Sequence, residues 1–336
     1  MRAAVMQGRG EPLSIEELPD PSPGPDQLLL GVSDCGICGS DLHIVDTADR
    51  PGHVLGHELS GEVVAVGAEV EGWGTGDRVA VLPLTGCGSC PSCLGGRPSR
   101  CTTSWGLVGG SLPGAYAEYV AVYPRQAYRL PEAVGQRHGA LVEPLAVAFH
   151  AWDKTPTETG QPVLVLGGGP VGQAVALWAR HFGASDVVLS DPVAHRRELA
   201  CRVGATATID PTTQDVREAF AEVAGGPPKV VLECVGIPGM IQQAFDLCEP
   251  DGRVTVVGMC IGTDQIIPTT AMRKELLAQF VLFYRAYDFA LTIRALERGA
   301  IDPTPLVTDV VDLDGLPPRF EALKRPTTEC KILIEP

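Results

Sequence analysis

The chain has 336 residues, of which 45% are hydrophobic and 20% charged, a composition typical of folded proteins that excludes a disordered chain. At roughly 100–200 residues per domain, this length predicts two domains. The formal net charge of −15 argues against nucleic acid and anionic membranes as partners, because an acidic surface repels phosphate groups. No apolar run approaches the roughly 20 residues of a membrane span, and the first residues lack a signal-peptide core, so we expect a cytoplasmic protein.

The first part of the chain predicts short strands joined by turns. Apolar runs at 28–34, 58–67 and 77–84 are bounded by Gly, Pro and Asp, which favour turns. Residues 84–114 are rich in Gly, Cys and Ser and show little periodicity. A loop of that length inside a domain needs a physical reason, and a bound metal ion would provide one.

Near residue 160 nearly all-apolar strands begin to alternate with helices. Residues 162–167 and 186–191 predict buried strands, and the helix between them has Pro170 near its start and Gly183 beyond its end. This alternation indicates a parallel sheet covered on both faces. Further strands are predicted over 229–236, 252–259 and 279–284.

A glycine-rich motif follows the first of these strands. Residues 167–172 fit the pattern G-x-G-x-x-G, and Asp191 ends the next strand. In this context the motif predicts a dinucleotide site, with the pyrophosphate at the helix N-terminus. A carboxylate at Asp191 would accept hydrogen bonds from a ribose diol and repel a 2′-phosphate, which favours NAD over NADP. Arg196 and Arg197 follow closely and could accept a phosphate, and a plain glycine turn is the alternative.

Four of the eleven cysteines form the pattern C-x2-C-x2-C-x7-C. In a reducing compartment such a cluster favours a metal over disulfides. Four thiolates satisfy a tetrahedral zinc ion without an open position, which predicts a structural zinc site. Free thiols in a loop, or a redox-active Cys pair, are the alternatives. The four residues are Cys87, Cys90, Cys93 and Cys101.

A second set of candidate ligands occurs in the segments CGICGSDLH and LGHELSG. Cys38, His57 and Glu58 offer a thiolate, an imidazole and a carboxylate. Three protein ligands with one open position are typical of catalytic zinc. Taken alone, a Cys or His in such segments is more often a packing or turn residue, so the residues by themselves leave both interpretations open.

These segments together resemble the zinc-dependent medium-chain alcohol dehydrogenase family, in particular its sorbitol, polyol and threonine dehydrogenase branch. The resemblance implies an α/β protein with a GroES-like, mostly-β catalytic domain over 1–147 and 288–336, including a zinc lobe at 84–114. It implies a Rossmann domain, with a doubly wound parallel sheet, over 148–287. The resemblance covers essentially the whole chain, through the motifs CGICGSDLH (35–43), GHELSGEVVAVG (56–67), GDRV (76–79), the four-cysteine run, GAYAEYV (114–120), LVEPLAVAFHA (141–151), VLGGGPVG (165–172) and PLVTD (305–309).

The resemblance also implies a catalytic zinc site. Cys38 and His57 match zinc ligands, and Glu58 matches a carboxylate that binds zinc directly or switches in and out. Glu143 matches the acidic position of the polyol branch, near the metal. A carboxylate that can leave or join the metal makes room for water or for a second substrate oxygen. We therefore expect hydride transfer between NAD(H) and a secondary alcohol or ketone that carries a second polar group, such as a polyol, diol, cyclitol or amino alcohol.

A proton relay and a cofactor site follow from the same resemblance. Ser40 matches the hydroxyl of the relay, His43 matches its outer histidine, and Asp41 matches the carboxylate that orients the zinc histidine. The implied cofactors are two zinc ions per chain and NAD, and the implied assembly is a homo-oligomer, either dimer or tetramer. The residues matched to cofactor contacts are Gly167, Gly169, Pro170, Val171, Gly172, Asp191, Arg196, Val235, Val257 and Gly258.

Other protein classes share parts of this pattern. A zinc-ribbon nucleic-acid binder could use the four cysteines, but the net charge opposes it. A non-enzymatic zinc- or nucleotide-binding protein should have lost Cys38, His57 or Ser40, and the zinc-free quinone reductases lack the four-cysteine lobe. Within the family, a broad-range enzyme for simple alcohols is the alternative. The segment between His43 and His57 is short and carries an extra histidine, His53, so the shape of the substrate cleft stays open.

Overall fold

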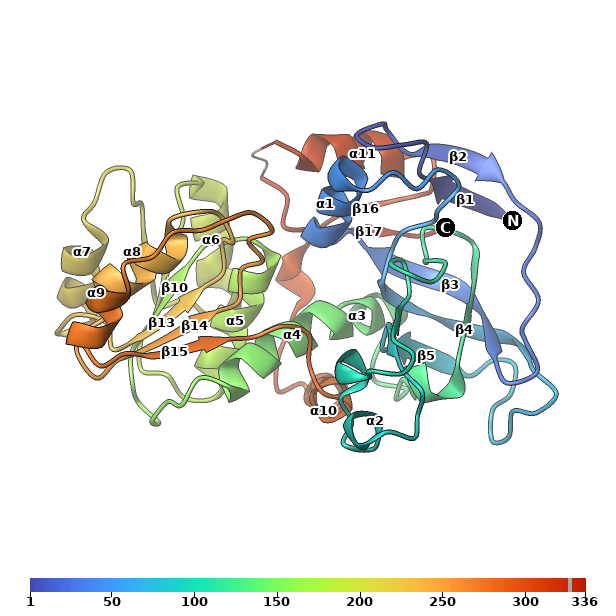
Figure 1. Cartoon of the computed structure of the whole chain (residues 1–336), viewed down its shortest axis with the longest axis horizontal. Helices are drawn as coiled ribbons and strands as arrows, with labels where there is room; N and C mark the ends of the chain where they lie inside the picture. The colour runs from blue at the N-terminus through green and yellow to red at the C-terminus, as the bar shows by residue number, and fades with distance from the viewer. Residues whose placement is uncertain (326–327) are drawn as a thin grey trace. The chain divides into compact units, whose positions relative to one another are not determined.

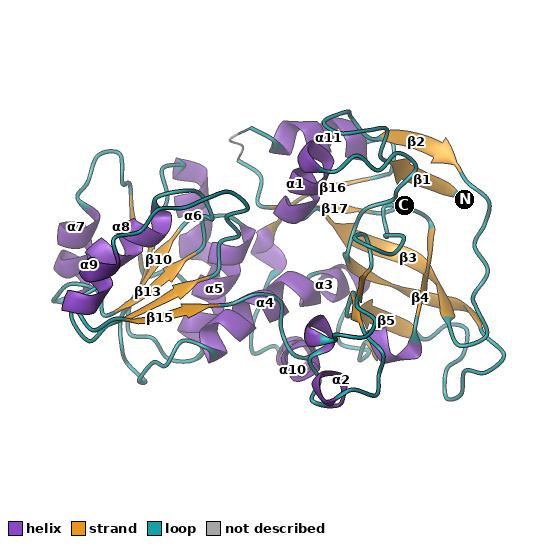
Figure 2. Ribbon diagram, viewed as in Figure 1, coloured by secondary structure: helices purple, strands orange, loops and turns teal. Residues whose placement is uncertain are grey.

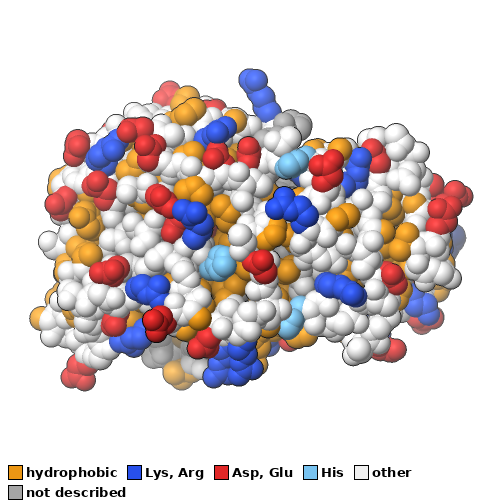
Figure 3. Space-filling model, turned by 180° about the vertical axis from the view of Figure 1, so that it is seen from behind, with side chains coloured by type: hydrophobic (Ala, Val, Ile, Leu, Met, Phe, Trp, Pro, Cys, Tyr) orange, Lys and Arg blue, Asp and Glu red, His pale blue; other side chains and the backbone are white. Residues whose placement is uncertain are grey.

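The computed structural model describes residues 1–325 and 328–336 (Figure 1). The chain falls into two compact units. Met1–Glu143, Tyr284–Arg298 and Val307–Pro336 form the first, and Pro144–Phe283 and Gly299–Leu306 form the second. Within the described ranges, no helix is long and apolar enough to cross a membrane. On the face drawn in Figure 3, basic side chains are interspersed with acidic ones.

The first unit is built around a seven-stranded sheet (Figure 2). Its central strand β3 (Leu28–Gly36) pairs antiparallel with β4 (Glu58–Val66), with Gly36 opposite Glu58. The other strands of this unit are β1 (Arg2–Val5), β2 (Ser14–Glu17), β5 (Arg78–Val81), β6 (Leu84–Thr85), β7 (Gly106–Leu107), β8 (Tyr119–Val122), β9 (Ala127–Arg129), β16 (Val307–Val311) and β17 (Lys331–Ile334).

Short helices connect and cover these strands. Val63, Val79 and Val81 are fully buried in the core of the sheet, and Phe320 of α11 packs against the same core. The helices of the first unit are α1 (Gly39–Thr47), α2 (Pro91–Leu94), α3 (Gln136–Ala140), α10 (Ala286–Glu297) and α11 (Leu316–Leu323).

The second unit contains a six-stranded parallel sheet in the order β12-β11-β10-β13-β14-β15, with helices on both sides (Figure 2). The inner strands VLVL, VVLS and VVLE are buried at every position, because helices cover both faces of a parallel sheet. The strands are β10 (Val163–Leu166), β11 (Val187–Ser190), β12 (Ala207–Ile209), β13 (Val230–Glu233), β14 (Arg253–Val256) and β15 (Leu277–Phe280). The helices are α4 (Val142–Asp153), whose first two residues belong to the first unit, α5 (Pro170–His181), α6 (Ala194–Val203), α7 (Val216–Ala224), α8 (Met240–Leu247) and α9 (Pro268–Arg273).

The last strand of this sheet differs from its predicted position. The sequence predicts a strand over 279–284, whereas β15 spans Leu277–Phe280. The reason is its neighbour: β14 ends at Val256, which pairs with Phe280, so the ladder can extend no further. The strand predicted from apolar composition alone therefore starts two residues and ends four residues too late.

Candidate functional site

Three candidate metal ligands meet where β3 leads into α1 and where β4 begins. Cys38 is the residue before α1, while His57 and Glu58 lie at the start of β4. Because Gly36 pairs with Glu58, the returning chain lies beside Cys38. One donor atom from each of the three residues lies within 4.8 Å of the others. A thiolate, an imidazole and a carboxylate at this spacing fit a zinc ion.

A buried carboxylate lies beside the histidine of this set. Asp41 is fully buried, and its Oδ1 lies 3.3 Å from Nδ1 of His57. The Tyr116 hydroxyl donates to Asp41 Oδ2 at 2.7 Å, and the Cys38 amide donates to the same oxygen at 3.2 Å. Burial would lower the pKa of His57, but the Asp41 carboxylate and the Cys38 thiolate outweigh it and hold that pKa well above its ordinary value.

The predicted relay hydroxyl lies beside the ligands. Ser40 Oγ donates to Cys38 Sγ at 3.2 Å and lies 3.5 Å from Nε2 of His57. His43 is exposed further along α1. Within the described ranges, no hydrogen bond joins its ring to Ser40. The structure therefore brings Ser40 to the ligand set and leaves His43 apart from it.

A lysine that sequence reasoning missed completes this region. Lys331 of β17 is 2% exposed, and its Nζ donates to both carboxylate oxygens of Glu58 at 2.7 and 2.6 Å. The same Nζ donates to the carbonyl of Ile37 at 2.9 Å. Burial would lower the pKa of Lys331, but Glu58 and Cys38 raise it above its ordinary value. The only signal in the sequence is a lysine next to the apolar run ILI.

Glu143 stands apart from the three close donors. It is buried in the first turn of α4, and Tyr284, a residue the sequence did not single out, donates its hydroxyl to Glu143 Oε1 at 2.9 Å. Burial raises the pKa of Glu143 to about 7, with His57 opposing that shift and Glu58 adding to it. The structure thus places Glu143 near the ligand set without making it one of the three mutually close donors.

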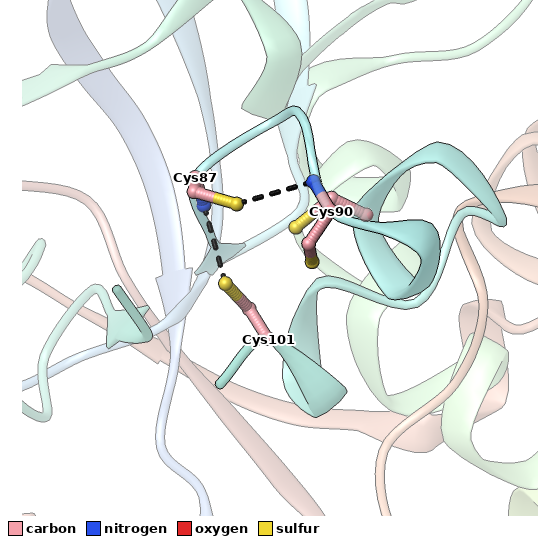
Figure 4. A group of neighbouring side chains, drawn as sticks. Cys87, Cys90 and Cys101 are labelled. Carbon is pink, nitrogen blue, oxygen red and sulfur yellow. Dashed lines mark hydrogen bonds between the residues drawn. The ribbon is translucent and has the colours of Figure 1, made fainter. Parts of the chain in front are cut away.

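The four cysteines form a second, separate cluster, and Figure 4 labels three of them, Cys87, Cys90 and Cys101. Their sulfur atoms all lie within 4.8 Å of one another. Backbone amides point at the sulfurs: Cys90 N donates to Cys87 Sγ at 3.3 Å, and the amides of Cys87 and Ser104 each donate to Cys101 Sγ at 3.4 Å. The single-turn helix α2 supplies the spacing between Cys90 and Cys93.

The acidities of these thiols differ widely. The backbone and hydroxyl of Ser89 and the amide of Cys90 lower the pKa of Cys87 to about 5. Burial and the crowding sulfurs raise the pKa of Cys93 to about 12. Four thiolates this close need a countercharge, and a tetrahedral zinc ion fits the donor set.

The glycine motif lies at the carboxyl end of β10. Gly167 has a φ of 97°, which favours glycine, and a Cβ on Gly172 would collide with the Gly167 carbonyl. Gly169 precedes α5, Pro170 is its first residue, and a Cβ on Gly169 would meet nothing within 4 Å. The open space at the start of a 12-residue helix fits a pyrophosphate.

The remaining candidate cofactor residues line the same edge of the sheet. Asp191 is 3% exposed, with Oδ2 accepting from the Gly168 amide at 2.7 Å and Oδ1 accepting from the Val193 amide at 2.8 Å. Nη1 of Arg196 lies 3.7 Å from Asp191 Oδ2. Val171 lies in the first turn of α5, Val235 follows β13, and Val257 and Gly258 follow β14.

Another residue that the sequence analysis did not single out shapes this edge. Glu233 is fully buried, and its Oε1 accepts from the amides of Val235 and Gly236 at 2.6 and 2.8 Å. Its backbone carbonyl accepts from Val257 and Gly258. One residue therefore fixes both loops that carry the predicted contacts Val235, Val257 and Gly258.

Comparison with known families decides between the protein classes. Residues 24–132 match the alcohol dehydrogenase GroES-like domain, and residues 170–298 match the zinc-binding dehydrogenase family. The chain belongs to the zinc-dependent medium-chain alcohol dehydrogenases. Members of this family are NAD(P)-linked oxidoreductases of alcohols, which confirms the predicted fold class and reaction class.

Similar dehydrogenases match along nearly the whole chain. Sorbitol dehydrogenase of Bacillus subtilis strain 168 is 31% identical over 100% of this chain and 97% of its own length. L-Threonine 3-dehydrogenase of Aeromonas salmonicida is 32% identical over 92% of each chain. Among solved structures, a zinc-binding dehydrogenase from Sinorhizobium meliloti bound to NADP has a TM-score of 0.91 at 33% identity, covering 100% of this chain and 99% of that one. An alcohol dehydrogenase from Escherichia coli CFT073 complexed with NADH has a TM-score of 0.91 at 30% identity, with the same coverage.

Proposed function

We propose that this dehydrogenase oxidises a secondary alcohol that carries a second polar group, such as a polyol, diol, cyclitol or amino alcohol, with NAD as the hydride acceptor. The observation that carries the proposal is the ligand set Cys38, His57 and Glu58 with the Ser40 hydroxyl beside it. A second buried carboxylate, Glu143, adds acidic character near that set. The similarity to sorbitol and threonine dehydrogenases supports the same substrate class.

In the mechanism we propose, the chain's own residues prepare and deprotonate the alcohol. Cys38 and His57, with Glu58 binding directly or switching in and out, would hold a zinc ion, which as a Lewis acid would lower the pKa of the substrate hydroxyl. Ser40 accepts the hydroxyl proton and passes it on towards solvent, where the exposed His43 completes the relay. Asp41 keeps the His57 ring oriented throughout. A bound nicotinamide would supply the acceptor for the hydride that leaves the substrate carbon.

We further propose a structural role for the second zinc ion, held by Cys87, Cys90, Cys93 and Cys101. The four thiolates leave no position for a substrate, and no side chain placed in the relay belongs to that cluster. Two zinc ions per chain are expected, and metal analysis of protein purified without chelators measures them. A zinc content of zero would contradict the proposal.

The preference for NAD rests on Asp191. A 2′-phosphate would meet this buried carboxylate, whereas a ribose diol would donate to it. Of the two following arginines, Arg197 already donates to the Asp191 carbonyl and pairs with Asp210 at 3.0 Å. Comparing kcat/KM for NAD and NADP tests this preference. A preference for NADP would refute it and assign Arg196 to the phosphate.

For the assembly we propose a homodimer through β15. This strand ends the six-stranded sheet, so one row of its backbone groups faces away from β14, and Leu277, Phe280 and Leu282 are each more than half exposed. A second copy pairing antiparallel would extend the sheet and cover these side chains. Light scattering should give twice the chain mass, and Phe280→Lys should give a monomer.

A cytoplasmic location remains the prediction made from the sequence.

Steady-state assays decide the substrate class. The set should include ethanol, 2-butanol, 2,3-butanediol, sorbitol, an inositol and threonine, each with NAD. A polar pocket discriminates strongly, because a substrate lacking the second polar group leaves buried groups unpaired. The highest kcat/KM should therefore belong to a substrate with two polar groups. If simple primary alcohols give the highest value, the enzyme is a broad-range alcohol dehydrogenase instead.

A further inference from the structure

The pairing of Glu58 with Lys331 goes beyond the roles assigned above. Glu58 is 1% exposed, and both of its carboxylate oxygens accept from a single ammonium group at 2.7 and 2.6 Å. That ammonium group also donates to the carbonyl of Ile37, the residue before Cys38. Lys331 therefore contacts both of the segments that carry the three candidate zinc ligands.

An ammonium group and a zinc ion compete for the same carboxylate. An oxygen of Glu58 can bind a zinc ion only by sharing or leaving its contact with Lys331, because both oxygens are engaged. The positive charge of Lys331 also opposes a second positive charge nearby. Glu143, a further acidic residue of the region, accepts a hydrogen bond from the neutral hydroxyl of Tyr284 and meets no such competition from that partner.

We infer that Lys331 is a positioning residue that holds the Glu58 carboxylate back from a bound zinc ion and so keeps one ligand position open for the substrate. The inference rests on the proposed function, since it requires zinc at Cys38 and His57. The competitor of zinc for the Glu58 carboxylate is then Lys331. When substrate is absent, Glu58 binds the metal only after its contact with Lys331 is broken or shared.

The inference predicts that removing Lys331 strengthens zinc binding, whereas removing an ordinary structural contact weakens it. Removing a residue that merely supports a metal ligand weakens metal binding by roughly 10–100-fold. Removing Lys331 instead frees an anionic carboxylate to bind zinc and removes a repelling charge. Zinc should then be held more tightly, while turnover falls because Glu58 occupies the position that the substrate needs.

The test is the rate of zinc release to a chromogenic chelator from zinc-loaded wild type, Lys331→Met and Lys331→Arg. The phase that belongs to this centre is identified as the one missing from Cys38→Ser. Release from Lys331→Met should be at least about tenfold slower than from the wild type, on the scale of effects of residues next to metal ligands. Lys331→Arg keeps the charge and should restore a rate near that of the wild type.

Two further variants separate this effect from a loss of stability. Lys274 of the second unit donates to three backbone carbonyls near the end of α8, so Lys274→Met removes an equally well-bonded lysine and should leave zinc release unchanged. Where Lys331→Met fails to fold, the double variant Glu58→Gln with Lys331→Met removes both buried charges. Compared with Glu58→Gln alone, it should show little slowing, because the competing carboxylate is gone.

The possible outcomes distinguish the inference from the proposed function. Slower release with lower kcat/KM supports the role assigned to Lys331. Unchanged or faster release from Lys331→Met, with zinc present in the wild type, overturns the inference and leaves the proposed function in place. A slowing of equal size in the Glu58→Gln background overturns it as well. Wild-type protein without zinc at Cys38 overturns both.

Discussion

The two metal-ligand clusters of the first unit differ in how the fold assembles them. The four cysteines lie within 15 residues of chain, and their sulfurs accept hydrogen bonds from nearby backbone amides and from the hydroxyl of Ser89. The set Cys38, His57 and Glu58 is drawn from two segments and is surrounded by buried charged side chains from further elements. Asp41 comes from α1 and Lys331 from β17.

The difference matches the role proposed for each cluster. A structural ion needs only ligands, so a local loop suffices. A catalytic ion needs ligands whose charge and orientation are set by their neighbours, and such neighbours must be held rigidly in a buried environment. We therefore expect substitutions in the first set to change activity and substitutions in the cysteine cluster to change stability.

The largest expected effect separates the two clusters directly. Cys38→Ser should lose one of two zinc ions and lower kcat/KM by at least about 10⁴-fold, because the Lewis acid is gone. Cys93→Ser should lose the other zinc ion and lower the melting temperature, because structural zinc contributes folding free energy. Metal analysis, melting curves and rates on both variants check this division. Equal loss of activity in both, at a temperature where both are folded, would contradict it.

Next in size is the relay hydroxyl. Ser40→Ala removes the group that donates to Cys38 Sγ at 3.2 Å, and kcat should fall by roughly 10²–10⁴-fold with zinc content unchanged. Ser40→Thr keeps a hydroxyl and serves as the matched control. An unchanged kcat in Ser40→Ala, with hydride transfer shown to be rate-limiting by a deuterium isotope effect, would remove Ser40 from the mechanism.

Local patterns in the sequence predicted the candidate ligands, and the family resemblance predicted Asp41 beside them, but neither predicted Lys331 or Tyr284. The four cysteines and the glycine motif are contiguous, and each has a spacing that chemistry dictates. Lys331 lies 273 residues from Glu58, and Tyr284 lies 141 residues from Glu143. The pairing of β17 with β3 brings Lys331 to the ligand set. The family resemblance assigns 288–336 to the first domain, but nothing in the run CKILIEP indicates which strand it pairs with.

The fold itself was more accessible to sequence reasoning. Buried parallel strands can be predicted from runs that are almost entirely apolar, as in VLVL and VVLS. Strand ends are set by the neighbouring strand, which is why β15 ends at Phe280 rather than at the end of its apolar run. Which side chains meet across the sheet of the first unit depends on the register of strand pairing, and composition does not determine that register.

A smaller effect is expected from the carboxylate beside His57. Asp41→Asn keeps the size of the side chain but removes the charge 3.3 Å from His57 Nδ1. Zinc affinity of the first set should fall by roughly 10–100-fold, as for other carboxylates that orient zinc histidines. Competition with a chelator measures the affinity, and the four-cysteine cluster within the same protein is the internal control. Unchanged affinity would show that the Asp41 charge does not influence zinc binding.

The smallest effect concerns Asp34, a buried carboxylate. Unlike Glu58, which Lys331 contacts closely, it has no cation within normal hydrogen-bond distance among the residues that the structure describes. Asp34 of β3 is 5% exposed, and Arg137 Nε lies 3.7 Å from its Oδ1. Burial raises the pKa of Asp34 to about 6, and the Arg137 charge only partly opposes that shift. The folded protein therefore binds more protons than the unfolded chain between pH 3.8 and about 6. The stability associated with this group is present below pH 3.8 and is lost as the pH rises through about 6.

Asp34→Asn should consequently stabilise the protein at pH 7–8 by about 1–2 kcal/mol, less than the ~3 kcal/mol of the full shift because Arg137 loses its partner. Near pH 4 the gain should vanish, since Asp34 is then protonated in the wild type. Asp77 is the control of opposite sign: the Gly74 amide and Arg129 lower its pKa, so Asp77→Asn should destabilise the protein at pH 7 and lose its effect in acid. Melting curves of the three proteins across this pH range give the comparison. A destabilised Asp34→Asn at pH 7 would mean that Arg137 compensates Asp34 as fully as Lys331 compensates Glu58.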